Sequence, residues 1–198
     1  MMPKDFNTIE INRLIRDRRS IYPTQYSGEN VPDEIVKQML ENANWAPNHK
    51  KTEPWRFTVF TADGLQQLAK FQSELYQRGA EKKGDFDQEK FNKLASKPLM
   101  ASHVIAIAMK RNPVVPEVEE IAAVACAVQN MYLTATAYGI GCYWGSGGIT
   151  YLDDAKEHFG LQPEDKLLGF LYVGMPKEGL WPEGKRGAYQ EKTHWVRG

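Results

Sequence analysis

The sequence predicts an α+β domain in which helices surround a small sheet. Helical segments outnumber strands, and they separate the strands at unequal intervals, unlike the regular spacing of parallel βαβ units. One long helix near the middle of the chain is apolar on almost every side, so it must be enclosed on most of them. With 198 residues the chain suits one domain, residues 1–198, and a second independent domain is not expected.

Charge and composition exclude several classes of function. The 25 basic side chains balance the 25 acidic ones, so no global field attracts nucleic acid or a membrane, and any anion site must be local. The first residues lack the apolar core of a signal peptide, and no apolar run approaches membrane-spanning length. Cys126 and Cys142 fit reduced thiols better than a disulfide framework. We therefore expect a cytoplasmic protein without a nucleic-acid or membrane partner.

The first two helices are predicted from apolar spacing and capping residues. Residues 8–19 repeat apolar side chains at helical intervals, and either Asn7 or Thr8 suits the helix N-terminus. Residues 31–47 carry proline in the first turn and one apolar face, and Pro47 ends the helix.

A strand, a third helix and a polar excursion are predicted next. Residues 54–62 alternate, with β-forming side chains throughout, which predicts a strand. Residues 65–75 carry leucines at helical spacing. Residues 79–93 are polar, contain glycine and have few apolar anchors, so we expect a mobile excursion or lid that runs into a short helix at 91–95.

The second half of the chain contains the most apolar segments. Residues 103–110 predict a strand buried on both faces. Residues 117–139 form the long helix, which ends at a glycine and, being too apolar for one small domain to enclose, is expected to pack against a second subunit. An exposed helix at 152–160 and a strand at 166–176 follow. The tail, residues 176–198, is too aromatic for disorder and too irregular for a helix, so we expect it to lie across its own domain or a partner chain.

Three polar turns are candidate binding sites. Arg18, Arg19 and Ser20 offer donors that suit a phosphate, although the dipole at a helix C-terminus also favours arginine without any ligand. His49 lies in the turn "APNHKKTEPW", where it could donate to a carbonyl or phosphate or simply be exposed. In "YGIGCYWGSGG" the spacing of a dinucleotide-binding motif fails, because Trp144 replaces its last glycine. A flat ring could approach the backbone there, or the segment could be a plain turn between helix and strand.

Metal and hydrolytic sites are not expected. His103 lies within an apolar strand and is interpreted as a core histidine, while His158 and His194 are isolated. The two cysteines stand far from any pair of histidines at ligand spacing, so no zinc site is predicted. The chain also lacks a P-loop and a G-x-S-x-G motif.

The ordered trio of "RRS", "AP-x-H-K-x-x-x-PW" and a glycine-rich "W-x-S-G" resembles the nitroreductase family of FMN-dependent NAD(P)H oxidoreductases. The resemblance extends from Asn12 to about Pro176 and is closest to a subgroup of short NAD(P)H nitroreductases. It implies a nitroreductase-like α+β fold, with a small, mostly antiparallel sheet surrounded by helices. It also implies a homodimer in which the long central helix lies at the interface and FMN binds between the subunits.

The resemblance also implies the site residues. Arg18, Arg19 and Ser20 would bind the FMN phosphate and ribityl end or the pyrimidine edge, with Lys185 or Arg186 of the tail completing the phosphate site. Trp45 and His49 match positions that reach the FMN held mainly by the other subunit. Thr134 matches a position that touches the nicotinamide cosubstrate, NADH or NADPH. The ring of the flavin would be lined by Trp144, Gly145 and Ser146.

Three departures from the family pattern affect charge near the flavin. Tyr22 stands where many relatives have a further arginine, and Gly145 stands where the closest relatives have another. Lys51-Thr52-Glu53 replaces a common N-x-Q, which adds one cation. Phosphate affinity and preference for charged substrates are therefore open.

The implied activity is a ping-pong transfer of hydride from NAD(P)H through flavin to a nitroaromatic, quinone or other electrophilic acceptor. Because the flavin carries the redox chemistry and solvent can protonate the product, no side chain is named as catalytic. The alternative is an FMN-binding carrier or sensor without efficient turnover.

Overall fold

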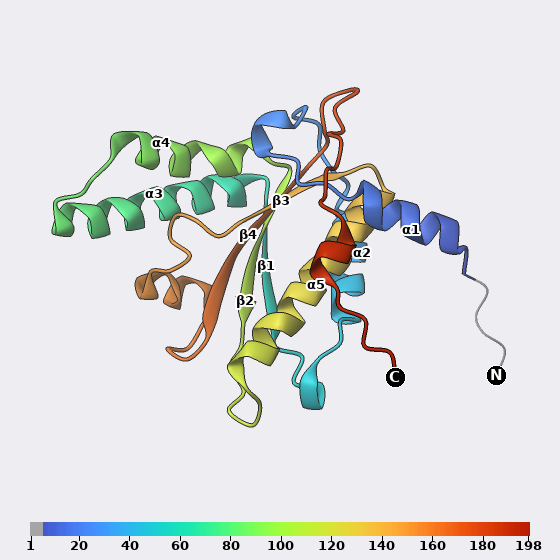
Figure 1. The fold of residues 1–198 in the computed structure, drawn as a ribbon. Coiled ribbons are helices and arrows are strands. Elements are labelled where there is room, and N and C mark those ends of the chain that lie inside the picture. Colours follow the sequence, from blue (N-terminus) through green and yellow to red (C-terminus); the bar gives the residue numbers. More distant parts are fainter. Residues whose placement is uncertain (1–5) are drawn as a thin grey trace.

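The computed structural model describes residues 6–198, which form an α+β fold built on one antiparallel sheet (Figure 1). The strand order is β1-β2-β4-β3, and every neighbouring pair is antiparallel. The strands are β1 (Trp55–Thr61), β2 (His103–Met109), β3 (Gly141–Gly145) and β4 (Lys166–Gly174). Three strands were predicted and are confirmed. β3 was missed, because it is short, begins and ends with glycine and was interpreted as a turn.

Helices cover both faces of the sheet. Helices α2 (Asp33–Asn44) and α5 (Glu117–Ala137) pack on one face, and α3 (Asp63–Lys83) packs on the other (Figure 1). Residues of β2 alternate between the two cores, so the whole strand is buried, as its continuous apolar run predicted. The long helix ends as expected, with Gly139 in the left-handed region at φ 69°.

His103 confirms the interpretation of a satisfied core histidine. It is 1 % exposed, and its Nε2 lies 3.0 Å from Asp33 Oδ1 in the first turn of α2. Its Nδ1 lies 3.0 Å from the Ser102 hydroxyl, which donates to Asn30 at 2.8 Å. The contacts of both ring nitrogens thus connect the start of β2 to the start of α2.

Helix α1 (Thr8–Asp17) lies outside this core. Asn7 caps it by accepting the N–H groups of Ile9 and Glu10, which confirms one of the two candidate caps. The helix ends two residues before the predicted boundary, so that Arg18 already has extended geometry, with φ −57° and ψ 127°. No residue of α1 is buried in the chain.

The segment 79–93 is mostly helical, and the short helix expected at 91–95 is confirmed within residues 88–96. Helix α3 continues to Lys83, Gly84 ends it at φ 72°, and the Asp87 side chain caps α4 (Gln88–Ser96). The two helices form a hairpin that projects beyond the sheet (Figure 1). The apolar face of α3 continues to Ala80, which is buried. One small apolar side chain in a polar segment was too weak a signal to predict this part of the helix. The role of the segment as a lid stays a prediction.

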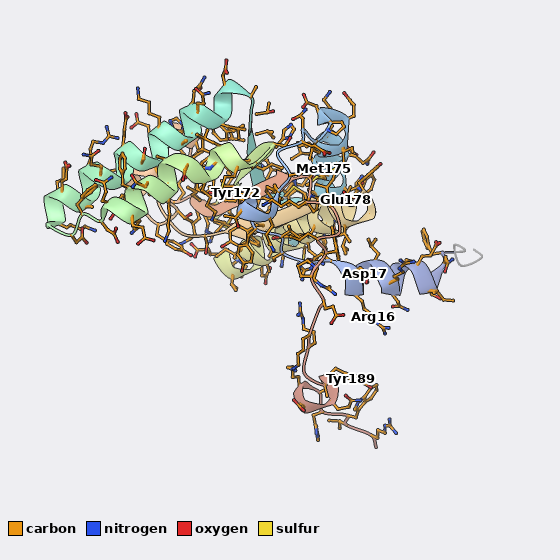
Figure 2. All side chains as sticks on the ribbon, turned by 90° about the horizontal axis from the view of Figure 1, so that it is seen from above. Arg16, Asp17, Tyr172, Met175, Glu178 and Tyr189 are labelled. Atoms are coloured by element: carbon orange, nitrogen blue, oxygen red, sulfur yellow. The ribbon has the colours of Figure 1, made fainter. Side chains whose placement is uncertain are left out.

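The tail runs past the end of α1 and then leaves the body of the molecule. Trp181 Nε1 donates to the Asp17 carbonyl at 2.8 Å, which holds the first part of the tail. Residues 183–198 are exposed, and Figure 2 shows Tyr189 well outside the rest of the structure. The predicted helix at 152–160 consists of two short 3-10 turns, Asp153–Ala155 and Glu157–Phe159. Across the described part of the chain, every helix is too short or too polar to cross a membrane.

Candidate functional site

Two of the three polar turns meet beside β3. The Ile21 N–H donates to the Cys142 carbonyl at 2.9 Å, and Ser20 forms a parallel bridge with Cys142. This pairing places the segment after α1 directly alongside the strand that carries Trp144 and Gly145. The motifs "RRS" and "GCYWGSGG", which lie far apart in the sequence, are therefore neighbours in the fold.

Tyr132 of α5 joins these two turns. Its hydroxyl accepts the Trp144 N–H at 2.7 Å and forms a hydrogen bond with the Ser20 side chain, and the Arg18 guanidinium lies 5.3 Å from its ring centroid. Burial, followed by nearby Cys142, raises the pKa of Tyr132 to about 12, although both hydrogen bonds and Arg18 oppose the shift. The hydroxyl is therefore neutral at pH 7, and its oxygen accepts from both the Ser20 side chain and the Trp144 N–H.

The Trp144 indole is held in the core. Its Nε1 donates to the Leu168 carbonyl at 3.0 Å, where a bulge in β4 leaves Leu168 without a partner on β2. Gly169 follows at φ 123°, and a Cβ there would lie 2.9 Å from the indole nitrogen. The indole thus has a structural role in this chain. Its neighbours are half-buried Gly145 and exposed Ser146, and the lining of a flavin ring by these three residues stays a prediction.

Arg19 connects the motif to the tail. Its Nε donates to the Pro182 carbonyl at 2.7 Å, and its Nη1 donates to the carbonyls of Arg16 and Arg18 at 2.5 and 2.9 Å. A Cβ on Gly184 would lie 2.4 Å from Arg19 Nη2, so the tail passes directly over the guanidinium. The exposed residues Lys185 and Arg186 follow immediately. Arg19 therefore contacts the tail at Pro182 and Gly184, directly before these two cations.

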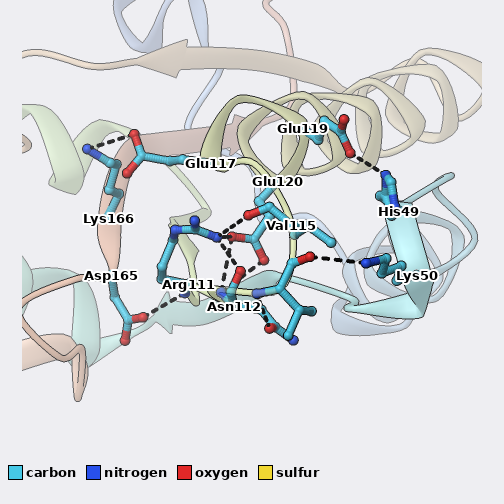
Figure 3. A network of polar contacts seen from close by, with 11 residues as sticks. His49, Lys50, Arg111, Asn112, Val115, Glu117, Glu119, Glu120, Asp165 and Lys166 are labelled. Atoms are coloured by element: carbon cyan, nitrogen blue, oxygen red, sulfur yellow. Dashed lines mark hydrogen bonds and ion pairs between the residues drawn. The ribbon is translucent and has the colours of Figure 1, made fainter.

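The third turn lies elsewhere in the same chain. His49 Nδ1 pairs with Glu119, and Lys50 Nζ donates to the Val114 carbonyl at 3.2 Å, both at the N-terminal end of α5 (Figure 3). Glu119 and Tyr132 are separated by about 20 Å along the helix. One chain therefore does not bring His49 to the other two turns.

The backbone of this third turn is strained. Lys50, Lys51 and Glu53 have φ of 50°, 56° and 45°, although none is glycine. Such conformations cost of order 1 kcal/mol each and persist where the surroundings impose them. Thr52, between them, has a buried hydroxyl oxygen without a hydrogen-bond partner among the described residues.

Trp45 and Thr134 lie at a shallow cavity of about 540 Å³ between α2 and α5. Trp45 is 78 % exposed, and its indole donates to Glu41 at 3.2 Å. The Thr134 hydroxyl is buried, donates to the Asn130 carbonyl at 2.9 Å and accepts from Asn42 at 2.8 Å. Its hydrogen bonds thus link α2 to α5. These two hydrogen bonds already use the Thr134 hydroxyl, and its contact with a nicotinamide stays a prediction.

A cavity of about 640 Å³ lies between the α3–α4 hairpin and strands β3 and β4, and we call it the hairpin cavity. Tyr22 from the first turn and Gly145, Gly147 and Gly148 from the second contribute to its lining. A Cβ on Gly145 would lie 3.0 Å from the Tyr143 ring, so the absence of a side chain keeps this wall open. Tyr22 lies against Tyr143, with ring centroids 4.6 Å apart.

The hairpin cavity also contains a buried donor available to a ligand. Gln72 of α3 lines it and is 1 % exposed. Its side chain is directed at the Tyr172 hydroxyl, and its Nε2 has no other partner within residues 6–198. Because an amide nitrogen carries two N–H groups, at least one of them is available to a ligand with acceptor atoms. A flat ring system with carbonyl and ring-nitrogen acceptors, such as a flavin, fits this lining.

Comparison with known proteins agrees with this arrangement. Residues 15–175 match the model of the nitroreductase family. The chain belongs to the nitroreductase family. It is 33 % identical over 146 residues to Escherichia coli YdjA, named provisionally as an NAD(P)H nitroreductase, with 73 % of this chain and 77 % of YdjA covered.

Solved structures of nitroreductase type share the fold. A nitroreductase-like family protein from Bacillus cereus superimposes with a TM-score of 0.78 at 27 % identity, with both chains covered completely. A protein from Desulfovibrio desulfuricans, described as a nitroreductase and solved in complex with FMN, gives a TM-score of 0.72 at 24 % identity, over 98 % of this chain and 99 % of its own. The predicted nitroreductase-like α+β fold is confirmed.

Sequence reasoning missed three residues of the candidate site, Gln72, Lys97 and Tyr132. Tyr132 was grouped with the apolar stripe of the long helix, although its hydroxyl joins the two turns. Lys97 was not considered, because it follows a polar helix and belongs to no motif. Its position in the cavity depends on the α3–α4 hairpin, which the sequence did not predict.

Proposed function

We propose that the chain is an FMN-dependent oxidoreductase that transfers hydride from NADH or NADPH to nitroaromatic, quinone or similar electrophilic acceptors in the cytoplasm. The main support for this proposal is that the turns of Ser20 and Trp144 both contact Tyr132. They lie beside the hairpin cavity, whose glycine-rich wall has room for a flat ring. Family membership and the name given to YdjA support the same activity.

The residues suit the two ends of FMN. Arg18 and Ser20 would hold its phosphate and ribityl end, with Lys185 or Arg186 brought close by the contact between Arg19 and the tail. The backbone of Gly145 and the side chain of Ser146 would meet the edge of the ring, and Gln72 would donate to one of its acceptor atoms. Bound FMN supplies the redox chemistry, taking hydride from the nicotinamide and passing it to the acceptor.

A homodimer would complete the site. On α5 one stripe of mostly small or apolar side chains is exposed or only half-buried, which leaves the helix unenclosed. The stripe consists of Val118, Ala122, Cys126, Gln129, Leu133 and Ala137. Ile9 and Ile15 of α1 are also 78 % and 52 % exposed. A second copy on this face would cover these residues and would bring its Trp45 and His49 to the FMN held by the first.

Purification and an anaerobic titration test the proposal. The protein is expected to be yellow, with about one flavin per chain and dimeric mass in solution. NADH or NADPH should bleach the flavin absorbance without oxygen, and a nitroaromatic or quinone should restore it. Bound flavin that neither nicotinamide reduces would indicate a carrier or sensor. The absence of the family's arginines at Tyr22 and Gly145 favours that alternative. A protein that retains no added FMN would overturn the proposal.

A further inference from the structure

The hairpin cavity contains an ammonium group without a counter-ion. Lys97, just after α4, is half-buried, and its Nζ lies 4.5 Å from the Tyr143 ring centroid and 4.6 Å from that of Tyr172. Burial lowers the pKa of Lys97, and no carboxylate within residues 6–198 lies close enough to form an ion pair with it. The two tyrosine faces offset only part of the lost hydration.

The rest of the lining is positive as well. Lys90 and Lys93 of α4 also reach the cavity, and within the described chain no aspartate or glutamate lines it. Lys93 is neutralised by Glu89 at 2.6 Å, and Lys90 lies over the Tyr76 ring at 4.5 Å. Lys97 is therefore the most buried of the three cations, and unlike Lys93 it has no carboxylate partner among the described residues. A negative group entering the cavity would gain most at its Nζ.

The remaining surface suits a flat apolar body. Three tyrosine rings, Tyr22, Tyr143 and Tyr172, line the cavity on the sheet side, and Leu94 and Met100 line it on the hairpin side. A volume of about 640 Å³ lies within the range for small-molecule sites. An aromatic ring packed on these surfaces, with an acidic substituent directed at Lys97, would match both the shape and the charge.

We propose that Lys97 selects acceptors that carry a carboxylate on an aromatic ring, so that the acceptor of this enzyme is an aromatic acid. The proposal rests on the function proposed above, because the acceptor would share the cavity with the flavin. Lys97 binds the carboxylate through its ammonium group, while the tyrosines contact the ring. Two cations that the family pattern places near the flavin are absent here, at Tyr22 and Gly145, and Lys97 supplies positive charge from the hairpin instead.

The test compares 4-nitrobenzoate with 4-nitrobenzamide, which has nearly the same shape but no charge. Wild-type holoenzyme is expected to show a kcat/KM for the acid at least tenfold above that for the amide, mainly through KM. Lys97→Met should reduce this ratio about tenfold, and Lys97→Arg should retain much of it. Lys70→Met is the control, because Lys70 lies on α3 of the same hairpin but is exposed, paired with Glu74 at 3.9 Å and outside the cavity lining, and its ratio should stay within twofold of wild type.

Binding without turnover separates this proposal from the proposed function. Quenching of tryptophan fluorescence by each compound, without nicotinamide, reports affinity whether or not the protein is an enzyme. Preference for the acid that Lys97→Met abolishes would support the carboxylate site even if no nicotinamide reduces the flavin. Equal affinity of wild-type protein for acid and amide would overturn it. So would a Lys97→Met variant that loses FMN while its acid-to-amide ratio is unchanged, since Lys97 would then bind the flavin.

Discussion

The hydroxyl of Tyr132 accepts the backbone N–H of Trp144 at 2.7 Å, and this contact fixes β3 against the long helix. The same hydroxyl forms a hydrogen bond with Ser20, so one side chain connects the two turns that are proposed to bind FMN. Neither partner could be inferred from the motifs themselves. Tyr132 is a positioning residue, because it acts on the flavin site through the backbone and side chain of its neighbours.

Tyr132→Phe should therefore weaken both the fold and flavin retention. The substitution leaves the Trp144 N–H without its partner, which should cost about 1–2 kcal/mol of unfolding free energy in urea. Flavin per chain after gel filtration should fall. Tyr138→Phe, at an exposed residue just after the same helix, should leave both quantities unchanged. Normal flavin content in Tyr132→Phe would show that the two turns are positioned by other contacts.

Arg18→Ala should reduce FMN retention without unfolding the protein. Arg18 lies over the Tyr132 ring and forms no ion pair with the described residues, so its charge is available to a phosphate. Flavin absorbance per chain should fall several-fold, while circular dichroism stays at its wild-type value. Arg16→Ala, on the exposed side of α1, is the control for a general loss of positive charge. Unchanged colour in Arg18→Ala would assign the arginine to the helix end alone.

Glu120 and Glu117 provide a matched pair of ionic contacts on one helix (Figure 3). Glu120 is 1 % exposed and accepts from Arg111 Nη1 at 2.6 Å and from the Asn112 N–H at 3.1 Å. Glu117 pairs with Lys166 at 3.2 Å near the surface. Glu120→Gln should lower the unfolding free energy by about 3 kcal/mol, because half-buried Arg111 loses the charge of its fully buried partner. Glu117→Gln should cost less than about 1 kcal/mol. Similar losses in both variants would contradict this difference in burial.

His158 should make stability depend on pH. Its ring stacks on Phe71, with centroids 3.6 Å apart, and burial lowers its pKa below the ordinary 6.5. The unfolded chain therefore binds a proton on His158 more readily than the folded chain does. The contribution of neutral His158 to the free energy of unfolding is complete above pH 6.5 and is lost as the pH falls below that value. Between pH 7.5 and 5, wild type should lose more unfolding free energy than His158→Phe. His194→Phe, in the exposed tail, is the control and should show the same pH dependence of unfolding free energy as wild type. The same pH dependence in His158→Phe would show that His158 does not cause it.

The sequence predicted those parts of the fold that depend on local periodicity. Apolar spacing located α2, α5 and three strands, and motif order located the two turns that meet. A short helix at 91–95 was predicted, but the continuation of α3 to Lys83 and its pairing with α4 in a hairpin were missed, because α4 has no buried residue and α3 ends on lysines. Lys97 and Gln72 enter the cavity only through that hairpin, and the contact between Tyr132 and Trp144 joins segments whose pairing no local pattern reveals.

The exposed stripe on α5 leads to a final prediction, on the dimer. Ala122 and Cys126 lie on neighbouring turns of the helix, and both are exposed in the single chain. Ala122→Arg adds a long cation without disturbing any buried contact of its own subunit. The variant should therefore stay folded by circular dichroism but appear as a monomer in sedimentation, because a charge would be buried at the subunit contact.

Flavin content should fall together with the dimer, since His49 pairs with Glu119, about 20 Å along α5 from Tyr132 of its own chain, and would reach a flavin across the interface. Gln66→Arg, on the exposed face of α3, is the matched control and should remain dimeric and yellow. A monomeric Ala122→Arg protein with full flavin content would show that one subunit binds FMN alone, and Trp45 and His49 would lose their proposed role. A dimeric variant would place the interface on another face of the molecule.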